Sequence, residues 1–156
     1  MAKTHKLQNI HVKAGDMRLD IDFGRMERNL NNAQFALDTA VMNSMEPFMP
    51  MQTHNFIDRT RAESMAIAGT GKVCAAAKPF GRFLYEGKTM VDEKTGSPWA
   101  REFAKKVLVS QYGGKTQARP DLQYGRRGAV DHWFEKAKQK DLSQWRRIVA
   151  EEMAKK

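Results

Sequence analysis

The first segment with a regular pattern lies between Met17 and Phe23, where apolar and polar residues alternate over seven positions. A period of two places successive side chains on opposite faces of an extended chain, so it predicts a half-buried β-strand. Residues 6–13 form another short candidate strand, and Ala14-Gly15-Asp16 between the two is a turn signal. The two segments together predict a β-hairpin.

The longest periodic stretch lies between Arg25 and Phe48, and its apolar residues are three or four positions apart. These are Met26, Leu30, Ala33, Leu37, Val41, Met45 and Phe48. This spacing places them on one face of a long amphipathic α-helix. Pro47 and Pro50 predict that the helix ends or bends at its last turn.

The region that follows this helix is polar, with few apolar anchors. Residues 53–60 suit a short helical turn or a loop. Two short apolar runs, 62–68 and 72–77, lie on either side of Gly69-Thr70-Gly71. Short apolar runs around a glycine-rich turn predict a second hairpin.

Short elements are also predicted between residues 79 and 110. Pro79 is suited to open a helix over 80–86, and Gly87 is suited to close it. Residues 89–91 and 105–110 are candidate strands, separated in part by a turn over 92–96.

The last third of the chain combines a long loop with helical segments. Residues 110–130 have no apolar period and contain several glycines, which indicates a functional or mobile loop. Asp131 is a candidate cap for a helix over 132–139, and Asp141 for a last helix over 142–153. The pattern as a whole predicts one α+β domain, with a small antiparallel sheet packed against the long helix and the C-terminal helices.

Composition narrows the class of protein. The 156 residues are 41% hydrophobic, which is enough for one domain with a real core. No apolar run approaches the roughly 20 residues that cross a bilayer, and the N-terminus has no apolar leader. A single cysteine, Cys74, excludes an internal disulfide and fits a reducing compartment. It lies in an apolar run, so we expect it to be packed rather than reactive.

The net charge of +9 is concentrated between Arg101 and Arg127, a stretch that contains seven basic residues and two acidic ones. Such a stretch contacts phosphate or an acidic protein surface, or it is a solvated loop that aids solubility. The candidates for such a contact are Lys115, Arg119, Arg126 and Arg127.

Motifs for catalysis, metal binding or cofactor binding are not convincing. Gly69-Thr70-Gly71-Lys72 resembles a phosphate loop, but Ala66 and Val73 stand where that motif requires glycine and Ser or Thr. The four histidines are scattered along the chain, without a cysteine pair, at His5, His11, His54 and His132. No Gly-x-Ser-x-Gly elbow is present. We therefore expect no catalytic residues, no metal and no cofactor.

Several segments resemble a known family. They are residues 37–51, 55–57, 66–77 and 85–88, with 97–100 and 132–134 also fitting. This succession resembles the minor capsid proteins of siphophages that infect Firmicutes, which are similar to the tail-completion, or head–tail joining, proteins of long-tailed phages. One departure is His54, which stands where the looser pattern has glycine, so either the turn differs or His54 contacts something.

The resemblance implies a structural part of the virion neck, made in the host cytoplasm, with no membrane association. Such proteins form a ring, expected to be a hexamer, between the stopper or adaptor and the tail terminator and tail tube, with DNA passing through the lumen. A stopper or tail terminator of the same neck and a basic nucleic-acid-binding module are the alternatives.

Two groups of residues are then candidates for assembly. The expected subunit interface consists of Met45, Phe48, Met49, Met51, Arg82, Tyr85 and Glu86. The expected contacts to a partner or to the lumen are Lys115, Arg119, Arg126 and Arg127.

Overall fold

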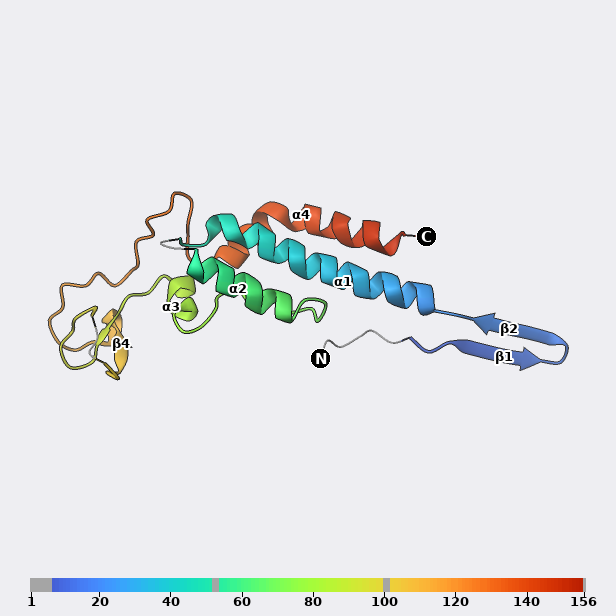
Figure 1. The fold of residues 1–156 in the computed structure, drawn as a ribbon, viewed down its shortest axis with the longest axis horizontal. Coiled ribbons are helices and arrows are strands. Elements are labelled where there is room, and N and C mark those ends of the chain that lie inside the picture. Colours follow the sequence, from blue (N-terminus) through green and yellow to red (C-terminus); the bar gives the residue numbers. More distant parts are fainter. Residues whose placement is uncertain (1–6, 52–53, 100–101, 156) are drawn as a thin grey trace.

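The chain is an α+β protein built around two long helices. The computed structural model describes residues 7–51, 54–99 and 102–155. Helix α1 (Gly24–Met45) and helix α4 (Trp133–Met153) pack side by side along most of their length, as Figure 1 shows. The α+β class is confirmed, with the strands divided between two separate two-stranded sheets rather than gathered into one.

The core lies between α1, α4 and α2 (Asn55–Ala66). Its centre is formed by Met42 and Met45 from α1, Ile57 from α2, and Trp133 and Trp145 from α4, each almost wholly buried. Burial of each such side chain contributes roughly 1.5–3 kcal/mol to stability. Both indole N–H groups are satisfied, because Trp133 donates to the Ala75 carbonyl oxygen at 2.8 Å and Trp145 to the Ser44 hydroxyl at 3.0 Å.

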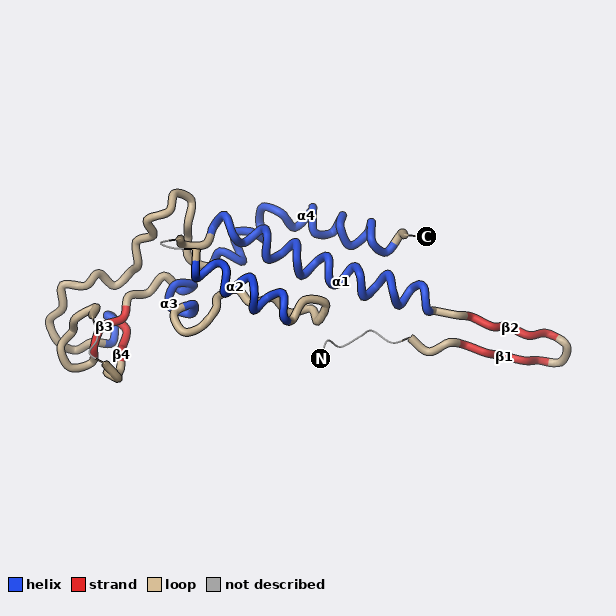
Figure 2. The backbone as a smooth tube through the Cα atoms, viewed as in Figure 1, coloured by secondary structure: helices blue, strands red, loops and turns tan. Residues whose placement is uncertain are grey.

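The N-terminal hairpin forms as predicted, from β1 (Ile10–Ala14) and β2 (Met17–Ile21). Its strands pair antiparallel around a turn in which Gly15 has a φ of 61°. The expected half-burial is wrong: only Ile21 is partly shielded, and every other residue of both strands is exposed. The reason is position, because the hairpin extends beyond the N-terminal end of α1 and away from the core (Figures 1 and 2).

The second predicted hairpin is wrong. Residues 62–66 belong to helix α2, and residues 72–77 form no strand. The glycines do make a turn, with φ of 84° at Gly69 and 74° at Gly71, but it ends a helix instead of joining two strands. The side of α2 that is buried includes Thr60 and Ser64, so the helix has no continuous apolar stripe.

The short elements of the middle follow the sequence prediction. Helix α3 (Gly81–Glu86) ends at Gly87, whose φ of 66° is left-handed. Strands β3 (Met90–Asp92) and β4 (Lys106–Leu108) pair antiparallel at the end of the molecule opposite the hairpin (Figures 1 and 2). After the short 3₁₀ turn η2 (Val109–Gln111), the chain runs to α4 as a long loop.

The C-terminal region is one helix, not the two predicted. Helix α4 continues through Asp141, and Asp131 is not its cap, since His132 occupies that position with a φ of 46° and no side-chain cap. At the start of α2, His54 has ordinary helical angles (φ −64°, ψ −20°) and is exposed. The turn at His54 therefore needs no glycine. Within the described residues, no helix is both long and apolar enough to cross a membrane.

Candidate functional site

Two of the methionines predicted at a subunit interface are core residues. Met45 and Met49 are 0% exposed, so neither can meet a partner while this fold is kept. Met49 follows the 3₁₀ turn η1 (Glu46–Phe48), which turns the chain back under the end of α1. Phe48 and Met51 are half-buried and pack against the same core, so only their edges face solvent.

Tyr85 joins helix α3 to helix α4. Its ring meets Trp133 edge to face, with centroids 4.8 Å apart, and its hydroxyl donates to the Glu135 carboxylate at 2.5 Å. Burial, followed by the hydrogen bond to Glu135, raises the pKa of Tyr85 above its ordinary value. Arg82 and Glu86 pair with each other along α3 at 3.2 Å and present their side chains to solvent. The interface prediction for Arg82 and Glu86 stays a prediction, while Tyr85 has a role within the fold.

The long loop between η2 and α4, which carries much of the excess basic charge, is attached to the helices at several points. Leu122 donates to the Gly87 carbonyl oxygen at 2.8 Å, Val130 to that of Phe48 at 3.0 Å, and His132 to that of Tyr85 at 2.9 Å. Tyr124 adds a hydrogen bond from its hydroxyl to the carbonyl oxygen of Leu84 at 2.5 Å. These contacts hold the second half of the loop against α3 and η1.

Arg126, which was expected to contact a partner or the lumen, lies against the end of α1. Its guanidinium is partly buried and donates to the carbonyl oxygens of Glu46 at 3.0 Å and Met49 at 3.5 Å. These carbonyls lie where α1 ends, and a cation there supplies a further donor to them and complements the helix dipole. Arg126 is thus committed to the fold, whereas Lys115, Arg119 and Arg127 are exposed and remain candidates for a partner or DNA.

The turn Gly69-Thr70-Gly71, which resembles a phosphate loop, already binds a side-chain carboxylate of the same protein. The buried Asp38 carboxylate accepts hydrogen bonds from the main-chain N–H groups of Gly69 at 2.8 Å and Gly71 at 3.1 Å. Gln34 adds a third donor at 2.8 Å. Because these N–H groups converge on an internal carboxylate, the turn is not available for phosphate.

The remaining polar candidates are dispersed. Among the described residues, no three His, Cys, Asp or Glu side chains come together as possible metal ligands. His11 lies in the exposed hairpin, 2.8 Å from Asp20, while His132 stacks obliquely against Tyr85; His5 lies outside the described residues. Cys74 is partly buried, and burial together with Glu63 raises the pKa of its thiol, which disfavours the reactive thiolate.

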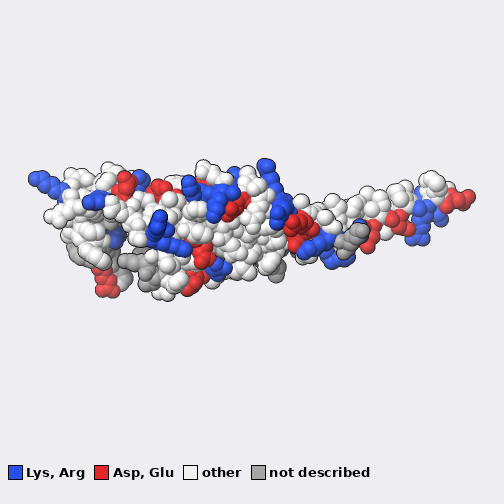
Figure 3. Space-filling view, turned by 90° about the horizontal axis from the view of Figure 1, so that it is seen from above, with Lys and Arg blue, Asp and Glu red and all other residues white. Residues whose placement is uncertain are grey.

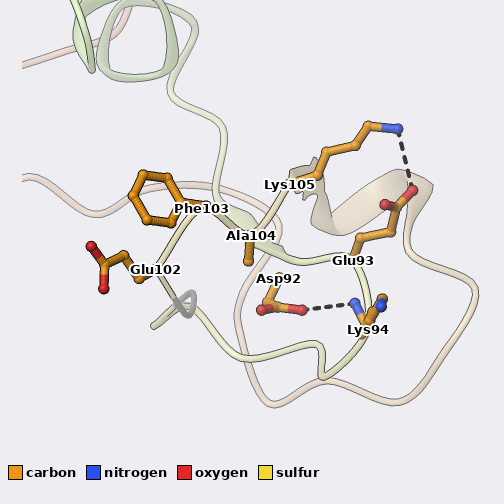
Figure 4. A pocket seen from close by; sticks show the side chains of 7 residues that line it. All are labelled: Asp92, Glu93, Lys94, Glu102, Phe103, Ala104 and Lys105. Atoms are coloured by element: carbon orange, nitrogen blue, oxygen red, sulfur yellow. Dashed lines mark hydrogen bonds and ion pairs between the residues drawn. The ribbon is translucent and has the colours of Figure 1, made fainter.

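A hollow beside β3 is shown in Figure 4. Asp92 forms part of its wall, and its carboxylate accepts from the main-chain N–H groups of Lys94 at 2.8 Å and Thr95 at 3.1 Å. Lys105 pairs with Glu93 at 3.3 Å. These contacts shape the β3–β4 connection. On the rim, Phe103 is 98% exposed and has a φ of 58°, which is unusual for a bulky residue.

The surface that sequence reasoning missed is one side of the N-terminal hairpin. Cross-strand partners on this side are Ile10 with Ile21, Val12 with Leu19, and Ala14 with Met17. We call these six residues the apolar face. The pairs on the other side are His11 with Asp20 and Lys13 with Arg18.

The separation of the two sides is visible in the space-filling view. Uncharged atoms follow one side of the hairpin and charged atoms the other (Figure 3). The signal was present in the sequence, since the period-two alternation continues across the turn with apolar residues opposite apolar residues. What the sequence did not indicate is that nothing else in the described chain covers this side.

The chain matches no protein-family profile, no curated protein and no solved structure with significance.

Proposed function

We propose that this chain is a structural subunit of the head–tail connector, or neck, of a long-tailed phage, and that it acts by contact rather than by catalysis. Its place is in a ring, expected to be hexameric, between the stopper or portal side and the tail tube. The ring belongs to the virion, and DNA passes through its lumen.

The observation that carries the proposal is the uncovered apolar face of the hairpin. Val12 and Leu19, which are paired across the strands, are 49% and 54% exposed, and Met17 is 77% exposed. An isolated two-stranded hairpin is at best marginally stable in water, and an exposed apolar patch marks a site of association. A protein that presents such an arm is best suited to work within an assembly.

The resemblance to phage minor capsid proteins supplies the identity of the assembly. The residues that carry it lie in elements that organise the body: Tyr85 joins α3 to α4, the Gly87 carbonyl oxygen accepts from Leu122 in the loop, and Trp133 is the largest fully buried side chain among the described residues. Residues that hold the helices together in this way are the ones that a family with a common fold is expected to share. The framework holds the exposed arm in place.

The test is cryo-electron microscopy of the neck of the phage that encodes the chain. We expect a ring in which the α1–α4 pair fits the density. If purified virions lack the chain, or if it lies outside the neck, the proposal is wrong. Density in the layer of the stopper or of the tail terminator would instead assign the chain to that alternative.

A basic nucleic-acid-binding module is the second candidate, and exposed Lys115, Arg119 and Arg127 favour it. Duplex DNA binding measured between 50 and 200 mM salt separates the two. A module that holds several phosphates loses affinity steeply over this range, on the order of 10³-fold or more. A neck subunit is expected to bind DNA weakly throughout the range, and tight, salt-sensitive binding would favour the module.

A further inference from the structure

A second apolar surface lies at the other end of the molecule from the hairpin. The β3–β4 connection, of which residues 93–99 and 102–105 are described, carries Trp99 at 86% and Phe103 at 98% exposure. We call it the aromatic loop. In Figure 4 the ring of Phe103 points away from Asp92, Glu93 and Lys105, to the same side as Glu102. Large aromatic side chains so fully in water are costly to a chain that acts alone.

The two surfaces are complementary in chemistry. The apolar face of the hairpin is a two-stranded ribbon of aliphatic side chains, and aromatic rings pack well on β-branched and aliphatic residues of a pleated surface. The hairpin segment 7–23 carries three acidic and two basic residues, with histidine neutral. The described residues of the opposite end, 88–99 and 102–121, carry six basic and four acidic residues, so the small net charges are of opposite sign.

We propose that the apolar face of one copy of this chain packs on the aromatic loop of a second copy, in a repeating head-to-tail contact. The geometry favours this pairing over two hairpins facing each other. A hairpin–hairpin contact stops at a dimer and leaves Trp99 and Phe103 exposed. A head-to-tail contact uses both surfaces in every copy, and it leaves neither uncovered once rotation closes the series into a ring.

This inference rests on the proposed function, because it names the partner of the same exposed arm. It specifies more than the neck assignment does, since a neck ring could equally be held together by the helices. Contact between copies through two different patches has a signature that no symmetric contact shares: two variants, each defective in a different patch, complement each other.

The experiment uses the full chain with Leu19→Asp to disable the apolar face, or Phe103→Asp to disable the aromatic loop. Both sites are exposed and outside the core, and Asp is among the residues that tolerate the positive φ of Phe103. Native mass spectrometry and light scattering measure the size of the wild-type chain, each variant and an equal mixture. Circular dichroism checks that the helices remain folded.

We expect the wild-type chain to form oligomers, and each variant alone to be monomeric. The mixture is expected to form dimers and nothing larger, because the intact hairpin of Phe103→Asp meets the intact loop of Leu19→Asp while the other patches are disabled. Matched controls are Lys13→Asp on the polar side of the hairpin and Phe80→Asp, an exposed aromatic residue at the start of α3. Both are expected to assemble like the wild-type chain.

Three results overturn the inference. They are a wild-type chain that stays monomeric, a Phe103→Asp variant that assembles normally, and a mixture that fails to form dimers. None of them bears on whether the chain is found in the neck, which microscopy of the virion decides separately. Conversely, complementation in a chain that is absent from virions would leave the head-to-tail contact in place and remove the neck.

Discussion

The carboxylate of Asp38, in the middle of α1, accepts a hydrogen bond of 2.8 Å from the main-chain N–H of Gly69, 31 residues later in the chain. This contact ties the end of α2 back onto α1, and the N–H of Gly71 joins it at 3.1 Å. Asp38 is only 5% exposed, so its charge is satisfied by the protein rather than by water. Asp38 thus holds the turn after α2, together with the main-chain hydrogen bonds from Ala68 to Met65 and from Thr70 to Ile67.

Replacement of Asp38 by alanine is expected to lower the free energy of unfolding by about 2–3 kcal/mol. The N–H of Gly69, which is partly buried, would lose a charged acceptor, while that of Gly71, which is exposed, can bond to water instead. Urea unfolding monitored by circular dichroism measures the change. The matched control is Asp58→Ala in the first turn of α2, an exposed residue whose loss removes only a dipole interaction of about 0.3–1 kcal/mol. Equal losses for the two variants would contradict the role given to Asp38.

Arg126 and Arg127 are neighbours in sequence with different surroundings, and they provide a second test. Arg126 donates to the carbonyl oxygens of Glu46 and Met49, while Arg127 is exposed. We expect Arg126→Ala to destabilise the protein by about 1–2 kcal/mol, because the end of α1 loses a charged donor. Arg127→Ala is expected to change stability by less than about 0.5 kcal/mol. Thermal unfolding of both variants at matched salt decides the point, and the reverse order would show that the loop is held by other contacts.

Gly87 closes α3 in a left-handed conformation that an L-residue adopts only with strain. A Cβ at this position would lie 3.1 Å from the Cβ of Asp131, and φ is 66°. Gly87→Ala is therefore expected to cost about 1–2 kcal/mol from the backbone alone, and more if Asp131 has to move. Gly125→Ala is the control, because a Cβ there meets nothing within 4 Å. Chemical unfolding of both variants should separate them, and a neutral Gly87→Ala would be inconsistent with this conformation.

The sequence predicted the elements whose apolar residues are regularly spaced, and it failed where buried positions are polar. Helix α2 was predicted only as a short helical turn or a loop over residues 53–60, and residues 62–68 as part of a hairpin, because its buried residues include Thr60 and Ser64. Their hydroxyls make internal hydrogen bonds: Thr60 donates to the Phe56 carbonyl oxygen, and Ser64 to that of Cys74. In a sequence, polar residues of this kind favour the prediction of a loop over that of a helix.

Helix α4 was divided in two for a similar reason. Trp133, Ala137 and Trp145 are its buried residues, at spacings of four and eight. Asp141 occupies the position halfway between Ala137 and Trp145, where it interrupts the apolar stripe and resembles a cap. No glycine or proline lies there to end the helix, so the hydrogen-bonded backbone continues through it.

The candidate site was predictable only in part. Alternation identified the hairpin but not the register that pairs Val12 with Leu19, and half-burial was inferred from the assumption that one side packs on the same chain. Nothing in the residues 10–21 themselves tells whether the covering surface is internal or belongs to a neighbour. The methionines at and after the end of α1 illustrate the converse, because Met45 and Met49 are as apolar as interface residues but pack in the core with Trp133 and Ile57.

Tyr124 makes stability depend on pH in the alkaline range. Burial raises the pKa of its phenol to about 12, against about 10 in an unfolded chain. The folded state thus favours the neutral form, so its contribution is complete below pH 10 and is lost as the pH rises towards 12. We expect the difference in unfolding free energy between the wild-type chain and Tyr124→Phe to be largest at pH 9 and to shrink between pH 10 and 12. Urea titrations across this range measure it, and a constant difference would contradict the buried phenol.

The rate at which the Cys74 thiol reacts reports on its surroundings beside helix α2. Burial raises its pKa first, and the hydrogen bond from its Sγ to the Glu63 carboxylate, at 3.3 Å, raises it further. Because the thiolate is the reactive form, the folded protein is expected to react with a disulfide reagent at pH 8 more slowly than the same protein in urea. Glu63→Ala removes an acceptor that favours the protonated thiol, so it should speed the reaction, whereas Glu86→Ala, distant along the chain and paired with Arg82, should not. An unchanged rate in Glu63→Ala would mean that burial alone sets the reactivity.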